Sequence, residues 1–201
     1  MCGRYYVDNE MVGELEKLIG QMDKAQREDS LRATAKIPAG DIYPGRAAPV
    51  LLGKNESVCC GWQRWGFPGF REKRLIFNAR CESVLEKPLF RGSMKHGRVV
   101  IPAMKFYEWN PSKEKSTFRR QNSSLLFMAG LSRRYEDGTH FTVLTTAANA
   151  SMKPVHDRMP LILERDEITE WMFDDAKAEQ ILHKIPCLLE RSSDYEQMRL
   201  F

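Results

Sequence analysis

Apolar residues recur at helical spacing near the start of the chain. The recurring positions are Val12, Leu15, Leu18, Ile19 and Met22. Spacings of three and four residues bring these side chains to one face, and Asp8 can cap the first turn, so the pattern predicts a helix over residues 8–27. The opposite face is charged, which indicates a helix that covers the domain from outside. The polar stretch 22–36 and the segment IPAGDIYPGRAAP predict a long loop.

Alternating or continuous apolar runs predict strands in much of the remaining chain. They cover residues 49–52, 57–65, 75–77, 98–109, 116–120, 125–135, 140–146 and 161–163. Helices are predicted over residues 80–96, with a break at Pro88, and over residues 166–183. Strands that follow strands, with helices at the edges, predict an α+β fold with a largely antiparallel sheet. A chain of 201 residues is expected to form a single domain, residues 1–201.

The composition is that of a globular protein with a mild basic excess. Apolar residues make up 42%, charged residues 29%, and the net charge is +4. No segment reaches the roughly 18 apolar residues of a membrane span, and no secretory signal precedes the first helix, so we expect a cytoplasmic protein. The basic excess permits a nucleic-acid partner without demonstrating one.

The five cysteines are an odd number in a chain without an export signal, which predicts reduced thiols. Cys59 and Cys60 are adjacent, whereas zinc ligands are usually separated by roughly two to four residues, so no metal site is expected. Buried apolar roles are expected for Cys59, Cys60, Cys81 and Cys187. Cys2 needs separate treatment because of its position.

Cys2 follows the initiator methionine in the opening MCGRYY. Removal of Met1, which is usual before a small residue, would leave an amine and a thiol on one residue, both expected to be usable near neutral pH. The amine condenses with an aldehyde to an imine, and the thiol then closes on the same carbon to give a thiazolidine. The pair also suits an N-terminal nucleophile hydrolase, in which the thiolate attacks an amide carbonyl. The alternative is an ordinary small apolar residue near the start of a strand.

A carboxylate occurs within the apolar segment IPAMKFYEWN. Strand periodicity places Met104, Phe106 and Glu108 on one face, so the carboxylate of Glu108 would lie among large apolar side chains. Burial away from a cation favours the protonated form and suits a general acid or base. The alternative is a glutamate at a strand end that simply meets solvent.

The segment KPVHDRMPL places a histidine in a stiff loop. His156 lies between Pro154 and Pro160, before an apolar strand, and is a candidate proton carrier. Asp157 could orient the imidazole, and Arg158 could bind an anion such as phosphate. The alternative is a loop in which the prolines serve turn geometry only.

In FNARCES, an amide and a guanidinium occur two residues apart. An extended backbone directs Asn78 and Arg80 to one side, where they could address one ligand. Glu82 could instead pair with Arg80 and give this cation a purely structural role.

Four short motifs occur in order along the chain: MCGR at the start, NARCES in the middle, FYEW after it and HDRMP toward the end. Together they resemble the SRAP family (SOS response-associated peptidase), whose members sense abasic sites in single-stranded DNA. The resemblance runs from residue 1 to about residue 175. It implies a single domain with a barrel-like, largely antiparallel β core flanked by helices.

The resemblance also implies a role for each matched residue. Cys2, freed of Met1, would form a thiazolidine with the ring-opened aldehyde of the abasic sugar. Asn78 would hold the cysteine backbone or the sugar, Glu108 would be the acid or base near the amine, and His156 would assist ring opening and proton transfer.

The implied DNA contacts include three cations for the phosphates that flank the lesion, Arg4, Arg80 and Arg158. Pro44 matches a loop proline that helps to wedge the DNA, and Phe70 falls where the family often has an aromatic residue for base stacking. The family often has a second aromatic at the next position, where this chain has Arg71.

The activity implied is covalent capture of abasic sites in single-stranded DNA, with self-removal of Met1 as the peptidase reaction and strand cleavage as a possible lyase reaction. No cofactor or metal is implied, and we expect a monomer that is cytoplasmic and nucleoid-associated during DNA damage. One alternative is an N-terminal cysteine amidohydrolase, because glutamine amidotransferase domains also begin Met-Cys-Gly. Another is a non-catalytic single-stranded DNA-binding module that uses Arg80, Arg158 and Phe70.

Overall fold

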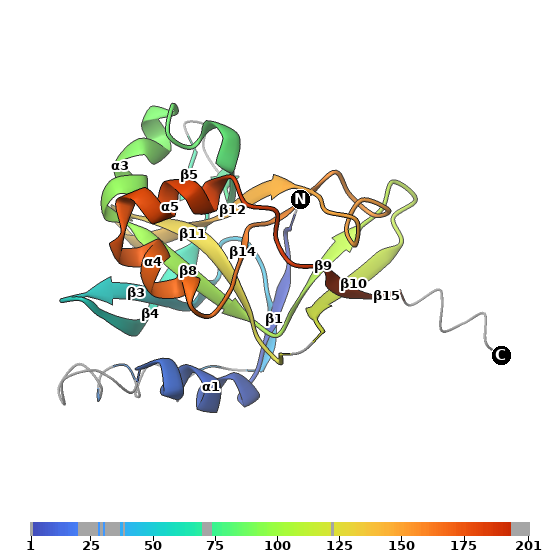
Figure 1. Ribbon diagram of the computed structural model, residues 1–201, viewed down its shortest axis with the longest axis horizontal. Coiled ribbons are helices and arrows are strands. Elements are labelled where there is room, and N and C mark those ends of the chain that lie inside the picture. Colours follow the sequence, from blue (N-terminus) through green and yellow to red (C-terminus); the bar gives the residue numbers. More distant parts are fainter. Residues whose placement is uncertain are drawn as a thin grey trace.

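Five strands form a closed barrel at the centre of the protein. The strands are β3 (Ala47–Lys54), β4 (Ser57–Trp65), β8 (Arg98–Ala103), β11 (Leu126–Tyr135) and β12 (Gly138–Ala147). They pair in the order β12–β4–β3–β8–β11, and β11 pairs back to β12. All of these pairs are antiparallel except β12 with β4. The computed structural model describes residues 2–19, 28, 30, 37, 39–69, 74–121 and 123–193 (Figure 1).

A second, five-stranded sheet lies beside the barrel, in the order β15–β10–β9–β1–β2. Its strands are β1 (Tyr5–Val7), β2 (Gly40–Ile42), β9 (Lys105–Trp109), β10 (Lys115–Arg120) and β15 (Leu189–Ser193). Every pair in this sheet is antiparallel. Figure 1 shows β9, β10 and β15 to the right of the barrel, with β1 between the two.

Short strands extend the barrel toward its helices. The strands β7 (Asn78–Arg80) and β13 (Arg158–Pro160) both pair with β12, the first parallel and the second antiparallel. The strand β14 (Ile162–Leu163) pairs with β11, and β5 (Phe67–Pro68) pairs with β6 (Leu75–Ile76). The central strand β12 therefore brings the NARCES and HDRMP motifs to its two sides.

Helices cover the outside of the barrel (Figure 1). They are α1 (Glu10–Ile19), α3 (Pro88–His96), α4 (Glu167–Phe173) and α5 (Asp175–Leu182), with the 3-10 turn η1 (Cys81–Ser83) after β7. The helix α4 packs on β3 and β8, where the Trp171 indole donates a hydrogen bond to the Val99 carbonyl at 3.0 Å. Because helices lie outside and apolar side chains fill the inside, β8 is buried along almost its whole length.

The α+β class, the single domain and the barrel-like core are confirmed, while several predicted boundaries are wrong. The predicted strand 98–109 is two strands that separate at Met104, since β8 belongs to the barrel and β9 to the second sheet. The predicted break at Pro88 is confirmed, since η1 precedes it and α3 begins at Pro88, where a missing backbone N–H costs nothing. The predicted helix 166–183 is two helices, because Asp174 is extended and its side chain caps α5 by accepting from the Lys177 N–H.

The first helix has the predicted cap, since the Asp8 carboxylate accepts from the Glu10 N–H at 2.9 Å. The described helix ends at Ile19, and residues 20–27 of the predicted helix lie outside the described residues. All five cysteines are free thiols; Cys59, Cys60 and Cys81 are buried as predicted, whereas Cys187 is only partly buried. Among the residues described, no helix has the length and apolar character needed to cross a membrane.

Candidate functional site

The N-terminal segment is anchored in the barrel directly after Cys2. Tyr5 is fully buried and its ring packs 5.0 Å from the ring of Trp65. The Trp65 ring in turn stacks on Phe141, with centroids 6.2 Å apart, and its indole N–H donates to the Phe77 carbonyl at 2.9 Å. Cys2 itself is only 1% exposed. The start of the chain is therefore part of the core, and its position is set by aromatic packing.

Asn78 holds the main chain of Cys2. Its Nδ2 donates a hydrogen bond to the Cys2 carbonyl oxygen at 2.9 Å. The strand β7 places Asn78 beside Val143 of β12, so the amide projects from the barrel wall toward the chain start. Its Oδ1 is buried and accepts no hydrogen bond within the described part of the chain. Asn78 thus fixes one atom of Cys2 and presents a further acceptor.

Glu108 is close enough to the Cys2 thiol to perturb its ionisation. Tyr5 pairs with Phe106, and continuation of this register sets Gly3 opposite Glu108. Glu108 is 5% exposed, which confirms the buried carboxylate predicted from strand periodicity. Burial, followed by the charge of Glu108, raises the pKa of the Cys2 thiol to about 12. In the chain that carries Met1 the thiolate is therefore disfavoured near neutral pH, and a usable thiolate after Met1 removal stays a prediction.

The Arg4 guanidinium lies in an aromatic cluster that the sequence analysis missed. The rings of Tyr43, Tyr107 and Trp109 lie 5.4, 5.0 and 4.8 Å from its central carbon. Its Nη1 donates to the Tyr43 hydroxyl at 2.8 Å and pairs with Asp41 at 3.3 Å. In FYEW, Tyr107 and Trp109 are two residues apart, so on a strand their rings point to the same face. This spacing could have predicted the aromatic cluster from the sequence.

Pro44 lies in a turn beside this cluster. The Arg46 N–H donates to the Tyr43 carbonyl at 3.1 Å, and Gly45 has a φ of 88°, which such a turn requires at this position. Pro44 is partly buried and follows the exposed Tyr43, whose ring lies 5.4 Å from the central carbon of Arg4. Phe70 lies outside the described residues.

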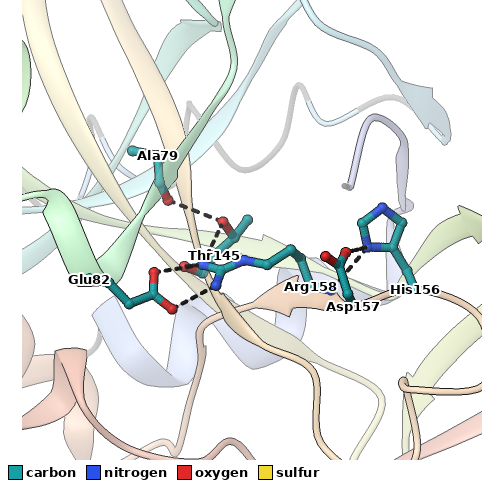
Figure 2. Close-up of polar contacts among 6 residues, drawn as sticks. All are labelled: Ala79, Glu82, Thr145, His156, Asp157 and Arg158. Carbon is teal, nitrogen blue, oxygen red and sulfur yellow. Dashed lines mark hydrogen bonds and ion pairs between the residues drawn. The ribbon is translucent and has the colours of Figure 1, made fainter.

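His156 has two partners at one ring nitrogen (Figure 2). Its Nδ1 lies 2.8 Å from the Asp157 carboxylate and 2.9 Å from the backbone nitrogen of Arg158. A protonated Nδ1 donates to Asp157, whereas a bare Nδ1 accepts from the Arg158 N–H, so the two contacts serve different protonation states. The prediction that Asp157 orients this imidazole is thus supported by direct contact.

Arg158 binds Glu82 through both of its terminal nitrogens. Nη1 donates to Oε1 at 2.6 Å, and Nη2 donates to Oε2 at 2.8 Å and to the Thr145 carbonyl at 2.6 Å. Hydrogen bonds from Arg158 hold the pKa of the Glu82 carboxyl below its usual range. The alternative in which Glu82 pairs with Arg80 is not borne out, since both carboxylate oxygens bind Arg158, which the strand β12 brings to them. Arg80 is exposed.

Two cavities border these residues. One, of about 790 Å³, is lined by Trp109, His156 and Lys153, among others. The other, of about 520 Å³, is lined by Asn78, Arg80 and the start of α3. Asn78 and Arg80 therefore share a side of β7 as predicted. Within the described ranges, no group of three or more histidine, cysteine, aspartate or glutamate side chains has the arrangement of a metal site.

The four sequence motifs thus converge in space. Asn78 contacts Cys2, Glu108 perturbs the Cys2 thiol, and Trp109 shares a cavity wall with His156. Over residues 1–199 the sequence also matches the family described as SOS response associated peptidase (SRAP). The chain belongs to the SRAP family. The match confirms the resemblance drawn from the motifs and extends it beyond residue 175 to nearly the whole chain.

Curated relatives of this SRAP chain occur in bacteria and vertebrates. The abasic site processing protein YoaM of Bacillus subtilis (strain 168) is 31% identical over 186 residues, covering 86% of this chain and 79% of that protein. The abasic site processing protein YedK of Escherichia coli (strain K12) is 26% identical over 180 residues, with 86% and 79% covered. The abasic site processing protein HMCES of Xenopus tropicalis is 32% identical over 123 residues, with 47% and 37% covered.

Solved structures share the SRAP fold of this chain at low sequence identity. A protein from Bacteroides thetaiotaomicron superposes with a TM-score of 0.73 at 17% identity, covering 96% of this chain and 91% of that chain. A phage-related protein from Bordetella bronchiseptica gives a TM-score of 0.72 at 22% identity, with 96% and 93% covered. These likenesses support the fold.

Proposed function

We propose that this protein processes abasic sites in DNA, and that it captures them covalently in single strands through Cys2 after removal of Met1. The observation that carries the proposal is the position of Cys2, whose carbonyl is held by Asn78 at 2.9 Å and whose thiol lies within the field of Glu108. The curated relatives are named as abasic site processing proteins, which supports the same substrate.

The reaction begins at the amine. The ring-opened abasic sugar presents an aldehyde, and attack by the Cys2 amine forms a carbon–nitrogen double bond and releases the carbonyl oxygen as water. The Oδ1 of Asn78 is buried without a partner among the described residues, and we propose it as the acceptor for this amine, with His156 as the proton carrier that assists ring opening. We propose that the amine acts first, because burial and the charge of Glu108 both disfavour the thiolate of Cys2.

Ring closure then makes the adduct durable. The thiol sulfur bonds to the imine carbon, the electrons of the double bond move to nitrogen, and the thiol proton is passed to that nitrogen with Glu108 as the carrier. The product is a thiazolidine formed with the loss of one water. We propose self-removal of Met1 as the only peptidase reaction, and strand cleavage by β-elimination wherever the imine persists.

The proposed DNA contacts differ in how their side chains are placed. Arg80 is exposed on β7 beside Asn78, which suits a phosphate contact. The guanidinium of Arg4 already pairs with Asp41, and that of Arg158 with Glu82. A DNA phosphate at either arginine would bind alongside that carboxylate or displace it. Pro44 and Phe70 remain proposed wedge and stacking residues.

The test is a crosslinking assay on a denaturing gel. Protein expressed from its native start codon is incubated with a single-stranded oligonucleotide in which one uracil has been converted to an abasic site by a glycosylase. The expected result is a shifted band that survives denaturant, disappears with Cys2→Ala and persists with the matched control Cys187→Ala. Absence of the band with the unaltered protein, or an undiminished band with Cys2→Ala, overturns the proposal.

A further inference from the structure

The ion pair between Glu82 and Arg158 joins two motifs that are 76 residues apart in the sequence. Glu82 belongs to η1, directly after the strand that carries Asn78, and Arg158 begins β13, directly after the loop that carries His156. Figure 2 shows the guanidinium of Arg158 between Glu82 and Thr145, and His156 near the backbone of Arg158. We propose that Glu82 is a positioning residue for the abasic-site reaction and that it acts through Arg158 on His156.

The side chain of Arg158 is held by three hydrogen bonds to two groups, the Glu82 carboxylate and the Thr145 carbonyl. Glu82 accepts from both terminal nitrogens, at 2.6 and 2.8 Å, and the Thr145 carbonyl accepts from Nη2 at 2.6 Å. The Thr145 hydroxyl donates in turn to the Ala79 carbonyl at 3.3 Å, which ties β12 to β7. A planar guanidinium bound at two nitrogens has a fixed orientation, so this contact sets the position of the whole residue.

The main chain of Arg158 acts on His156. Its N–H lies 2.9 Å from Nδ1 and donates to that nitrogen when the proton of the neutral imidazole is on Nε2. The Asp157 carboxylate, 2.8 Å from the same nitrogen, accepts instead when Nδ1 carries the proton. Both ends of one residue are therefore engaged, the side chain with η1 and β12 and the backbone with the imidazole. A shift of the side chain moves one of the two groups, the Arg158 N–H and the Asp157 carboxylate, that together set the proton position on His156.

Because the Arg158 side chain is largely buried, this arrangement depends on the carboxylate of Glu82. The Arg158 side chain is only 13% exposed, whereas that of Glu82 is 52% exposed. A buried guanidinium without its carboxylate is costly, so loss of Glu82 drives Arg158 toward solvent and takes the 156–158 backbone with it. The consequence is a misplaced proton carrier in a protein that is otherwise folded.

A competing role for Glu82 predicts a different result. If the carboxylate only shields Arg158 from DNA phosphate, its removal tightens DNA binding and leaves the chemical step unchanged. If it positions His156, its removal slows the chemical step at saturating DNA. Binding and chemistry can be measured separately, because a tetrahydrofuran analogue of the abasic site binds but has no aldehyde.

This inference rests on the proposed function, and its test is the rate constant for crosslinking at saturating abasic DNA. We expect Glu82→Gln to lower that rate constant about 10-fold, equivalent to about 1.4 kcal/mol, while affinity for the tetrahydrofuran oligonucleotide stays within about 3-fold. Glu82→Asp, which keeps the charge, restores part of the rate. The matched control is Glu86→Gln, an exposed carboxylate four residues further along, and it reacts at the unaltered rate.

A double variant separates positioning from general loosening of the fold. In a His156→Ala background, Glu82→Gln is expected to cause no further loss, because the group that it positions is gone. An equal loss in both backgrounds, or an unaltered rate constant for Glu82→Gln, overturns the inference. If the unaltered protein forms no crosslink at all, the proposed function fails instead, so the two failures are distinguishable.

Discussion

Replacement of Asn78 by aspartate tests whether its hydrogen bond to Cys2 positions the nucleophile. The substitution preserves the shape of the side chain but replaces the donor Nδ2, 2.9 Å from the Cys2 carbonyl, with an acceptor. A buried carbonyl that loses its donor costs about 1–3 kcal/mol. For a chain of this size, each kcal/mol lowers the melting temperature by about 2–4 °C. The melting temperature of Asn78→Asp is therefore expected to be about 2–12 °C lower than that of the unaltered protein.

The effect on chemistry is expected to exceed the effect on stability. Displacement of a reacting group by about 1 Å can cost about 100-fold in rate, and the amine of Cys2 is joined to the released carbonyl through a single carbon, Cα. Single-turnover crosslinking of abasic single-stranded DNA measures the rate, and thermal unfolding measures the stability. The matched control is Asn55→Asp, the same change at an exposed position in the β3–β4 turn. A rate for Asn78→Asp within about twofold of the control refutes the positioning argument.

Three further changes address the remaining parts of the site. Glu108→Gln removes a negative charge that raises the pKa of the Cys2 thiol, so alkylation of Cys2 by iodoacetamide should begin at lower pH while crosslinking slows. Arg4→Lys loses the planar contacts with its aromatic cluster and should lower the free energy of unfolding in urea by about 1–2 kcal/mol. Arg80→Ala should reduce the salt dependence of single-stranded DNA binding by about 0.7 in log–log slope.

Each of these predictions has a contradicting outcome. Coincident alkylation profiles for the unaltered protein and Glu108→Gln would remove Glu108 from the surroundings of the thiol. A urea midpoint unchanged by Arg4→Lys would show that the aromatic cluster contributes nothing to stability. An unchanged salt slope for Arg80→Ala would mean that this exposed cation contacts no phosphate.

The longer strands could be predicted from sequence because their signal is local. The pair β3 and β4 combines two apolar runs with a turn at Asn55 and Glu56, and the structure has both strands. The strands β1, β2 and β15 were missed because three to five residues carry too little pattern. Their pairing is also non-local, as in the pairing of Tyr5 with Ile42 and Phe106.

Candidate residues could be predicted by type, but their partners could not. Cys2, Asn78 and Glu108 stand out as chemical groups in restricted segments, and the structure places them together. The sequence offered Arg80 as one possible partner of Glu82, whereas the fold supplies Arg158 through β12. Ion pairs that depend on the order of strands in a sheet cannot be predicted until the sheet topology is known.

The central claim is that the Cys2 amine and thiol both bond to one carbon of the abasic sugar. The most direct measurement is the intact mass of the purified protein–DNA adduct, with tryptic mapping of the attached residue. The account predicts the mass of the chain without Met1 plus the oligonucleotide, less one water, with the linkage on Cys2. It also predicts no gain of two hydrogens after borohydride treatment, because an imine has the same mass as the thiazolidine but is reduced. An adduct that retains Met1, or that is attached to any other residue, would contradict it.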